Sequence, residues 1–305
     1  MLRDFALLAL ALAGGLALQR RAPSDSLRSR AWTAYFWTLA PALAFYAFST
    51  VSLDRRLGLA LAAAVSATWI VAAIGYCYAA LVSKERDERG ALALAAGFPN
   101  TGFVGQPLAH IVLGNPGLAL AVVYDRLAWL VPQSAVSTAI ARLHGRALHS
   151  SLPDRRRRLR LLLLNPPLFA ALAAVAVRLA GLELGSTVSP LGHAAGAAVG
   201  PAGFFLLGLA LPLDPPSHGT AELRRAAGVL FIRFALAPLV LFACGLALGA
   251  AIPAAFYLAA AMPCAFHLLI LARVFDVRPQ LVRLLVVAST VVAVAAVLAV
   301  AAVLR

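Results

Sequence analysis

Long apolar runs separated by short charged segments make up most of the chain. A helix needs about 20 apolar residues to cross the roughly 30 Å hydrocarbon core of a bilayer, and most of the runs approach or exceed that length. The pattern therefore predicts an all-α membrane protein of about ten transmembrane helices. The predicted spans cover residues 4–19, 31–50, 57–82, 90–113, 117–142, 160–181, 188–211, 222–250, 253–275 and 280–304.

The basic residues favour one side of this predicted membrane domain. Of the 26 Lys and Arg residues, 19 fall in every second loop, 5 fall in the other loops and the termini, and Arg126 and Arg233 fall inside spans. Cytoplasmic loops are the ones enriched in Lys and Arg. The distribution predicts a protein of the cell membrane with both termini outside and the long loop 143–159 in the cytoplasm.

That Arg-rich loop divides the chain into two halves of five spans, residues 1–142 and 160–305. Because five is odd, the second half must enter the membrane from the opposite side to the first. Pro41 and Pro201 stand in the second span of each half and are 160 residues apart. We therefore expect two inverted five-helix repeats, an arrangement found in many secondary transporters.

Prolines also interrupt the fourth and ninth spans at matching places. Pro99 stands among Gly97, Gly102 and Gly105, and Pro263 lies 164 residues after Pro99. A proline inside a helix removes a backbone donor, and unpaired backbone inside a membrane is tolerated where it lines a cavity. We expect broken helices 4 and 9 to cross there and to direct half-helix N-termini, which favour an anion, at a binding site.

Composition excludes several other functions. The chain is 62% hydrophobic and only 12% charged, too apolar for a soluble domain of 305 residues. Its net charge of +14 would indicate nucleic-acid binding in a soluble protein, but membrane topology accounts for the basic loops, so no nucleic-acid partner is expected. Cys77, Cys244 and Cys264 lack any paired spacing, and we expect no metal and no cofactor.

Residues 97–127, with the sequence GFPNTGFVGQPLAHIVLGNPGLALAVVYDRL, resemble the signature stretch of the auxin efflux carrier family, bacterial branch. Residues 165–175, 205–211 and 261–281 are similar to its second-half landmarks. The resemblance implies a ten-helix inverted-repeat fold with crossing discontinuous helices 4 and 9. It also implies efflux or exchange of small organic anions, such as auxin in plant relatives and malonate in bacterial ones.

The same resemblance implies the binding residues. Pro99 and Pro263 match the crossover prolines, and Asn100 matches a polar residue whose amide could donate to a carboxylate. Cys264 and His267 depart from the second proline and the asparagine that bacterial relatives often have, and His267 could bind the substrate or carry a proton. The substrate-binding candidates are Pro99, Asn100, Thr101, Gly102, Pro263, Cys264 and His267.

Asp125, Arg126 and Arg233 are charged residues inside predicted spans, where ionised groups are costly unless they are paired or hydrated. Arg126 could face an anion, and Asp125 could titrate or pair with Arg233. A structural ion pair between helices is an equal alternative. Arg233 could instead extend its side chain toward the cytoplasmic surface.

The sequence thus predicts a carrier that exports or exchanges a small organic anion by alternating access. One alternative is a sodium-coupled symporter like the bile acid symporters, and another is a membrane protein that transports nothing. No protease or hydrolase motif is present, so an enzyme is not expected. The expected partners are the small anion and the lipid bilayer, and a homodimer is left open.

Overall fold

The computed structural model describes residues 2–21, 23–129, 132–147, 165–182, 184–211 and 220–303, and these ranges contain helices and no strand. The predicted loop 143–159 lies outside the described residues beyond residue 147. Wider, π-helical turns cover Thr101–Gly105, Asp125–Trp129, Pro132–Val136 and Ile232–Leu236. The α-helices are α1 (Leu2–Arg20), α2 (Asp25–Trp37), α3 (Leu39–Thr50), α4 (Arg55–Val82), α5 (Arg86–Gly97), α6 (Gln106–Tyr124), α7 (Ser137–His144), α9 (Pro166–Leu179), α10 (Gly185–Ala210), α11 (Thr220–Phe231), α12 (Ala237–Ala247), α13 (Ala254–Ala260), α14 (Leu268–Phe275) and α15 (Pro279–Val303).

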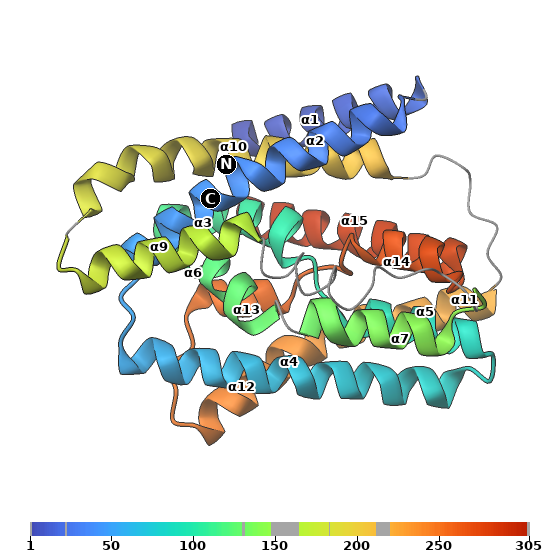
Figure 1. Cartoon of the computed structure of the whole chain (residues 1–305). Helices are drawn as coiled ribbons and strands as arrows, with labels where there is room; N and C mark the ends of the chain where they lie inside the picture. The colour runs from blue at the N-terminus through green and yellow to red at the C-terminus, as the bar shows by residue number, and fades with distance from the viewer. Residues whose placement is uncertain are drawn as a thin grey trace.

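Two groups of helices enclose the centre of the molecule. Figure 1 shows α1, α2 and α10 together on one side and α4 and α12 on the opposite side, with α6 and α13 between them. Helix α1 packs along α10, α3 along α9 and α4 along α12. Helix α5 contacts α4, α7, α11 and α15, and residues 90–97 of it are all buried. A helix that is apolar on every face belongs in such a central position.

Within the described residues, five helices are long and apolar enough to cross a membrane, and they begin and end at Arg55–Val82, Thr101–Ala128, Thr187–Ala210, Glu222–Ala247 and Pro279–Val297. The second of these contains Gly114, whose φ of 69° and ψ of −164° divide it into two helices. This turn lies between the predicted spans 90–113 and 117–142. The other predicted spans correspond to shorter or interrupted helices, so ten spans and inverted repeats remain predictions.

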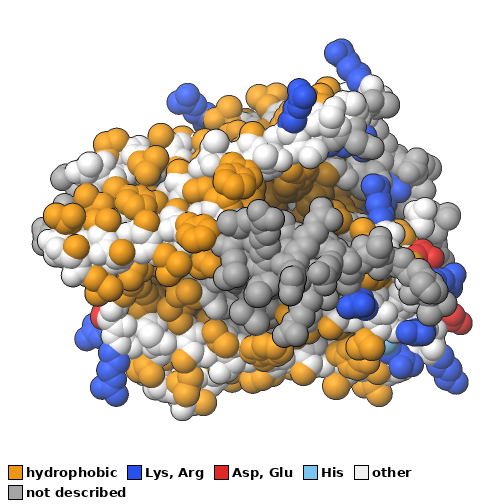
Figure 2. Space-filling model, viewed as in Figure 1, with side chains coloured by type: hydrophobic (Ala, Val, Ile, Leu, Met, Phe, Trp, Pro, Cys, Tyr) orange, Lys and Arg blue, Asp and Glu red, His pale blue; other side chains and the backbone are white. Residues whose placement is uncertain are grey.

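The surface fits a protein surrounded by lipid. Figure 2 shows hydrophobic side chains over much of one face and charged side chains mostly toward opposite ends of it. Exposed large apolar residues include Leu81, Leu179 and Leu10, which are 86%, 84% and 69% exposed. Side chains of this kind face lipid at no cost, whereas in water so much exposed apolar surface would favour aggregation.

Local chemistry explains where several helices begin, break and meet. The Asp54 carboxylate accepts a hydrogen bond from the Leu57 N–H at 2.8 Å and begins α4. Pro41 cannot donate to the preceding turn, and the helix of the second predicted span breaks nearby at Thr38. Gly15 of α1 lies so close to α10 that a Cβ there would be 2.2 Å from the Phe205 carbonyl oxygen. Small residues permit this close helix packing in membranes.

Buried acidic residues tie together one end of the bundle. Asp87 in the first turn of α5 pairs with Arg146 at 2.8 Å and with Arg278 at 3.0 Å, and the neighbouring Glu88 pairs with Arg225. Acidic groups are favourable at a helix N-terminus. These ion pairs join α5 to the segment after α7, to α11 and to the connection between α14 and α15.

Candidate functional site

Two interrupted segments meet in the buried centre of the molecule. We call residues 98–100, between α5 and the π-helical turn, the first break, and residues 261–267, between α13 and α14, the second break. Pro99 and Cys264 form an antiparallel bridge. The Asn100 N–H donates to the Pro263 carbonyl at 2.6 Å, and the Ala265 N–H donates to the Phe98 carbonyl at 2.8 Å. The structure thus brings together the two proline-interrupted segments that the sequence singled out.

Each proline fits the extended backbone of its break. Pro99 and Pro263 have no N–H to donate, so neither can continue the helix that precedes it. The residue before a proline is also driven toward extended geometry, and Phe98 has φ −117° and ψ 109°. The polar groups that the helices lose here are partly recovered because each break hydrogen-bonds to the other.

Asn100 carries the clearest sign of a binding function in the first break. Its Oδ1 accepts a hydrogen bond from the Phe103 N–H at 3.1 Å, which fixes the orientation of the amide. Its Nδ2 is buried and has no hydrogen-bond partner within the described residues, although the side chain is only 3% exposed. A buried amide donor without a partner costs about 1–3 kcal/mol, so a ligand that accepts from it would recover that energy.

Asp125 is held beside the first break by several donors. The Thr101 hydroxyl donates to its Oδ1, and the Gln106 amide donates to its Oδ2 at 3.4 Å. Arg126 Nη2 lies 3.3 Å from the same Oδ2, and this ion pair is only partly exposed. Asp125 thus pairs with its own neighbour in the chain. Within the described residues it does not form the ion pair between helices that the sequence left open as an equal alternative.

A cavity of about 280 Å³ lies against both breaks. Of the site residues predicted from the sequence, its lining includes Pro99, Asn100, Thr101, Gly102, Asp125, Arg126 and His267. Pro263 and Cys264 form the backbone contact beside it and are absent from its lining. Tyr35, Phe36, Phe103 and Phe266 give the same cavity an aromatic part.

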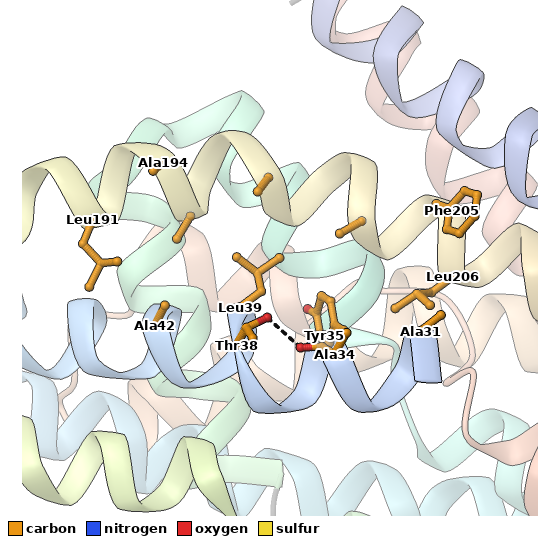
Figure 3. A pocket seen from close by; sticks show the side chains of 13 residues that line it. Ala31, Ala34, Tyr35, Thr38, Leu39, Ala42, Leu191, Ala194, Phe205 and Leu206 are labelled. Atoms are coloured by element: carbon orange, nitrogen blue, oxygen red, sulfur yellow. Dashed lines mark hydrogen bonds between the residues drawn. The ribbon is translucent and has the colours of Figure 1, made fainter. Parts of the chain in front are cut away.

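A larger cavity, of about 570 Å³, lies between α2, α3 and α10. Figure 3 shows its lining, with Leu191, Leu39 and Leu206 among mostly alanine side chains and one hydrogen bond from the Thr38 hydroxyl to the Ala34 carbonyl. Its lining carries no charge, so it offers little to orient a polar substrate. We therefore place the candidate site in the smaller, polar cavity at the breaks.

Aromatic rings connect α2 to both breaks. Trp32 packs edge-on against Phe103, with ring centroids 5.0 Å apart, and stacks on Phe266 at 5.5 Å. Tyr35 lies 5.2 Å from Phe103. Phe103 follows the first break and Phe266 belongs to the second, so one side of the cavity is closed by rings from three segments of the chain.

Arg233 lies on a different face of the crossing. Its side chain is 1% exposed and donates to the carbonyl oxygens of Ala96, Ala260 and Met262. The hypothesis that it extends to the membrane surface is therefore wrong. In the described part of the chain no carboxylate pairs with it, so the predicted pair with Asp125 is not formed.

Several neighbours of the breaks were not identified from the sequence. Gln106 contacts Asp125, and Ser289 of α15 accepts a hydrogen bond from the Cys264 N–H at 3.0 Å. Tyr35 and Phe266 complete the cavity wall. A hydroxyl residue in a mostly apolar helix, as Ser289 is, was the one available signal, and it is weak because such residues are common in membrane helices.

Comparison with known proteins identifies the family. Residues 33–300 match the family described as membrane transport protein, which includes the auxin efflux carriers. The chain belongs to this family. That family is one of membrane transporters and not of enzymes.

A curated relative agrees with this assignment. An uncharacterized transporter of Methanothermobacter thermautotrophicus is 29% identical over 167 residues, which cover 55% of this chain and 51% of the relative. The match spans about half the length of that relative, so it supports membership of the membrane transport protein family and specifies no substrate.

Proposed function

We propose that this membrane transporter carries a small organic anion with a carboxylate group, and that the anion binds in the cavity at the two breaks. The observation that carries the proposal is the Asn100 amide, because Asn100 lines the cavity and its buried Nδ2 has no hydrogen-bond partner in the described chain. A carboxylate oxygen accepts strongly from such a donor, and hydrogen bonds to charged groups contribute about 1.5–3 kcal/mol.

Charge in the cavity supports an anion. Arg126 lines it, and the half-helices that follow the breaks begin there at Thr101 and Leu268 with the positive ends of their dipoles. Asp125 carries the opposing charge. Its carboxylate already accepts hydrogen bonds from the Thr101 hydroxyl and the Gln106 amide and pairs with Arg126. The groups left to meet a ligand are therefore mainly donors.

The size of the cavity favours a small substrate. Its volume of about 280 Å³ lies at the lower end of ligand pockets, which run from about 300 to 1,000 Å³. Phe36, Phe103 and Phe266 offer apolar surface opposite the polar groups. A compact carboxylate with an apolar or planar body fits these dimensions.

Packing between helices supports alternating access through inverted repeats. If the first and sixth spans correspond, and the second and seventh, then the packing of α1 on α10 is the counterpart of the packing of α9 on α3. The contact between α4 and α12 and the contact between the breaks would each map onto themselves. In such carriers one helix group moves against the other around the bound substrate.

The membrane potential could drive export of an anion. An inside-negative voltage supplies about 2.3 kcal/mol per elementary charge for each 100 mV. Proton coupling through Asp125 or His267 is a second possibility within the same proposal. Transport into proteoliposomes with and without a pH gradient distinguishes the two, because a carrier driven by voltage alone responds to the imposed potential and not to the gradient.

A sodium-coupled symporter is the alternative, and the scarcity of side-chain oxygens at the second break argues against it. A sodium site needs several oxygen atoms free to coordinate the ion. Here the Thr101 hydroxyl and the Gln106 amide donate to Asp125, and Asn100 Oδ1 accepts from the backbone. The Asp125 oxygens are therefore occupied by donors, and residues 261–267 of the second break include no Asn, Gln, Asp, Glu, Ser or Thr side chain that could add an oxygen ligand.

The test of the substrate class is a thermal-shift screen of mono- and dicarboxylates on the purified protein, with matched sulfonates and uncharged amides for comparison. We expect one or more carboxylates to raise the melting temperature of the wild type and to lose that effect in Asn100→Ala. Asn115→Ala is the control, because Asn115 lies just after the Gly114 turn and outside the cavity lining. Full retention of the shift in Asn100→Ala would contradict the proposal.

The proposed orientation places both termini outside the cell membrane. The basis is the excess of Lys and Arg in alternate predicted loops. A fusion of alkaline phosphatase to the C-terminus would be active outside the cytoplasm, whereas a fusion in the loop 143–159 would be inactive. Cross-linking of the protein in its native membrane would test for the homodimer.

A further inference from the structure

The C-terminal ends of the two helices that precede the breaks are directed at one side chain. Arg233 stands in the π-helical turn Ile232–Leu236 between α11 and α12. Its Nη2 donates to the Ala260 carbonyl at 2.7 Å, its Nη1 to the Ala96 carbonyl at 3.3 Å, and its Nε to the Met262 carbonyl at 3.2 Å. Ala96 is the second-last residue of α5, Ala260 is the last residue of α13, and Met262 belongs to the second break.

Those carbonyls form a site for positive charge. The last carbonyls of a helix have no partner within the helix, and each helix end carries roughly half a negative charge. Two such ends together approach one full charge, which is what a guanidinium balances. Among the described residues no carboxylate pairs with Arg233, so backbone oxygen atoms supply its counter-charge.

We propose that Arg233 is a built-in cation that permanently fills a cation site at the crossing of the two broken segments. In carriers with discontinuous helices, unwound carbonyls and half-helix C-termini coordinate the coupling ion. Here the chain's own guanidinium makes those contacts from a neighbouring helix. The site is defined by the crossing itself, and only its consequence for transport rests on the proposed function.

The consequence concerns the coupling ion. A soluble cation that binds with the substrate must be taken up and released in every cycle, whereas Arg233 cannot leave. Anion binding on the cavity side would then need no sodium and no other soluble cation at this place. The same arrangement would keep the crossing neutralised whether or not a substrate is present.

The surroundings of Arg233 show what its removal would create. A small void of about 10 Å³ adjoins the side chain and is lined by Thr68, Tyr124 and Trp129, among others. That volume is close to the minimum for one water molecule. Truncation of Arg233 to alanine would join the space of the lost side chain to this void and leave three carbonyl oxygens as ligands for a small cation.

The experiment measures the melting temperature of Arg233→Ala in buffer whose only salt is choline chloride, with guanidinium or sodium chloride added up to tens of millimolar. We expect a melting temperature about 5 °C or more below that of the wild type. Guanidinium, sodium or both should restore at least half of this loss in a saturable manner, while extra choline chloride should restore none. The wild type should respond to none of these salts.

Arg178→Ala is the matched control. Arg178 of α9 also donates to backbone carbonyls at a helix end, those of Phe48 and Val51 near the end of α3, but it lies away from the crossing and is partly exposed. We expect any loss of stability there to show no dependence on the cation. Equal recovery of the two variants by the same salts would overturn the proposal, as would an Arg233→Ala protein as stable as the wild type.

Two more substitutions separate charge from hydrogen bonding. Arg233→Lys keeps a cation, and Arg233→Gln keeps a donor without the charge. We expect the lysine variant to be folded and close to the wild type in stability, and the glutamine variant to behave like alanine or fail to fold. A glutamine variant as stable as the wild type, or a lysine variant that does not fold, would overturn the built-in cation.

Failure of this proposal is distinguishable from failure of the substrate proposal. A carboxylate screen without a hit would remove the proposed substrate class, while cation-dependent recovery of Arg233→Ala would still stand. Conversely, carboxylate shifts that depend on Asn100, combined with cation-independent stability of Arg233→Ala, would leave the substrate class intact and remove only the cation site.

Discussion

The first and second breaks make the same backbone contact with each other but surround it with different chemistry. The first break is joined to the next span through the Thr101 hydroxyl, which donates to Asp125. The second is joined to the next span through Ser289, which accepts from the Cys264 N–H. Asp125 and Ser289 are 164 residues apart, the same separation as between Pro99 and Pro263.

This difference indicates that the charged groups of the site are divided unequally between the two breaks. The first break and the residues beside it supply the Asn100 amide, the Thr101 hydroxyl and the Asp125–Arg126 pair to the cavity, whereas the second break supplies Ala265, Phe266 and His267. The two breaks thus present different side chains to one cavity. The following four predictions test that division.

The largest effect is expected from Asp125→Ala. The substitution removes an ion-pair partner and the acceptor of two hydrogen bonds, and breaking a buried pair in this way costs about 3 kcal/mol or more. The measurement is the free energy of unfolding in detergent micelles. Addition of Arg126→Ala in the same chain should recover part of the loss, because no unpaired arginine remains. A loss no greater than that of Ser289→Ala would contradict the division between the breaks.

A smaller effect is expected from Thr101→Val, which keeps the shape of the side chain and removes the hydroxyl. A hydrogen bond to a charged group contributes about 1.5–3 kcal/mol, so we expect the free energy of unfolding to fall by about 2 kcal/mol. Thr290→Val is the control, since the Thr290 hydroxyl bonds only to the Val286 carbonyl of its own helix. If the two substitutions lower the free energy of unfolding equally, the hydrogen bond from Thr101 to Asp125 contributes no more than a hydrogen bond within one helix.

For Ser289→Ala we expect a loss of about 1 kcal/mol. The substitution removes two neutral hydrogen bonds, the one accepted from the Cys264 N–H, which is left buried, and the one donated to the Val286 carbonyl of the same helix. The melting temperature of the variant should fall by about 2–4 °C. Carboxylate binding should be unchanged, and a lost carboxylate shift would show that the second break takes a larger part in recognition than its residues indicate.

The smallest effect is expected for the aromatic contacts of Trp32. Double-mutant cycles of Trp32→Leu with Phe103→Leu and with Phe266→Leu should each give a coupling energy of about 0.5–1.5 kcal/mol. Similar values would mean that α2 holds both breaks equally. A coupling found with Phe103 alone would mean that the second break is free of α2.

The sequence was sufficient for those features that depend on single residues. Pro99 and Pro263 located the breaks because a proline cannot donate within a helix, and the flanking glycines strengthened that prediction. Asn100 stood out as a polar residue at such a point. The turn at Gly114 falls between the predicted spans 90–113 and 117–142, although the two spans themselves stay predictions.

Features that depend on packing between distant segments could not be predicted. Nothing in the sequence near Arg233 indicates that its partners are carbonyls of Ala96 and Ala260, which lie 137 and 27 residues away. The meeting of Trp32 with Phe103 and Phe266 depends on how α2 lies across the breaks. The sequence left open a pair between Asp125 and Arg233, but Asp125 pairs with Arg126 within a π-helical turn.

The turn at Gly114 has a mechanical consequence. A single residue with a positive φ, followed closely by Pro116, reverses the chain between the helix that begins at the first break and the helix that ends beside Asp125. Because this linkage is short, we expect any displacement of Thr101 to move Asp125 with it, so that the binding loop and its acid shift as one rigid unit.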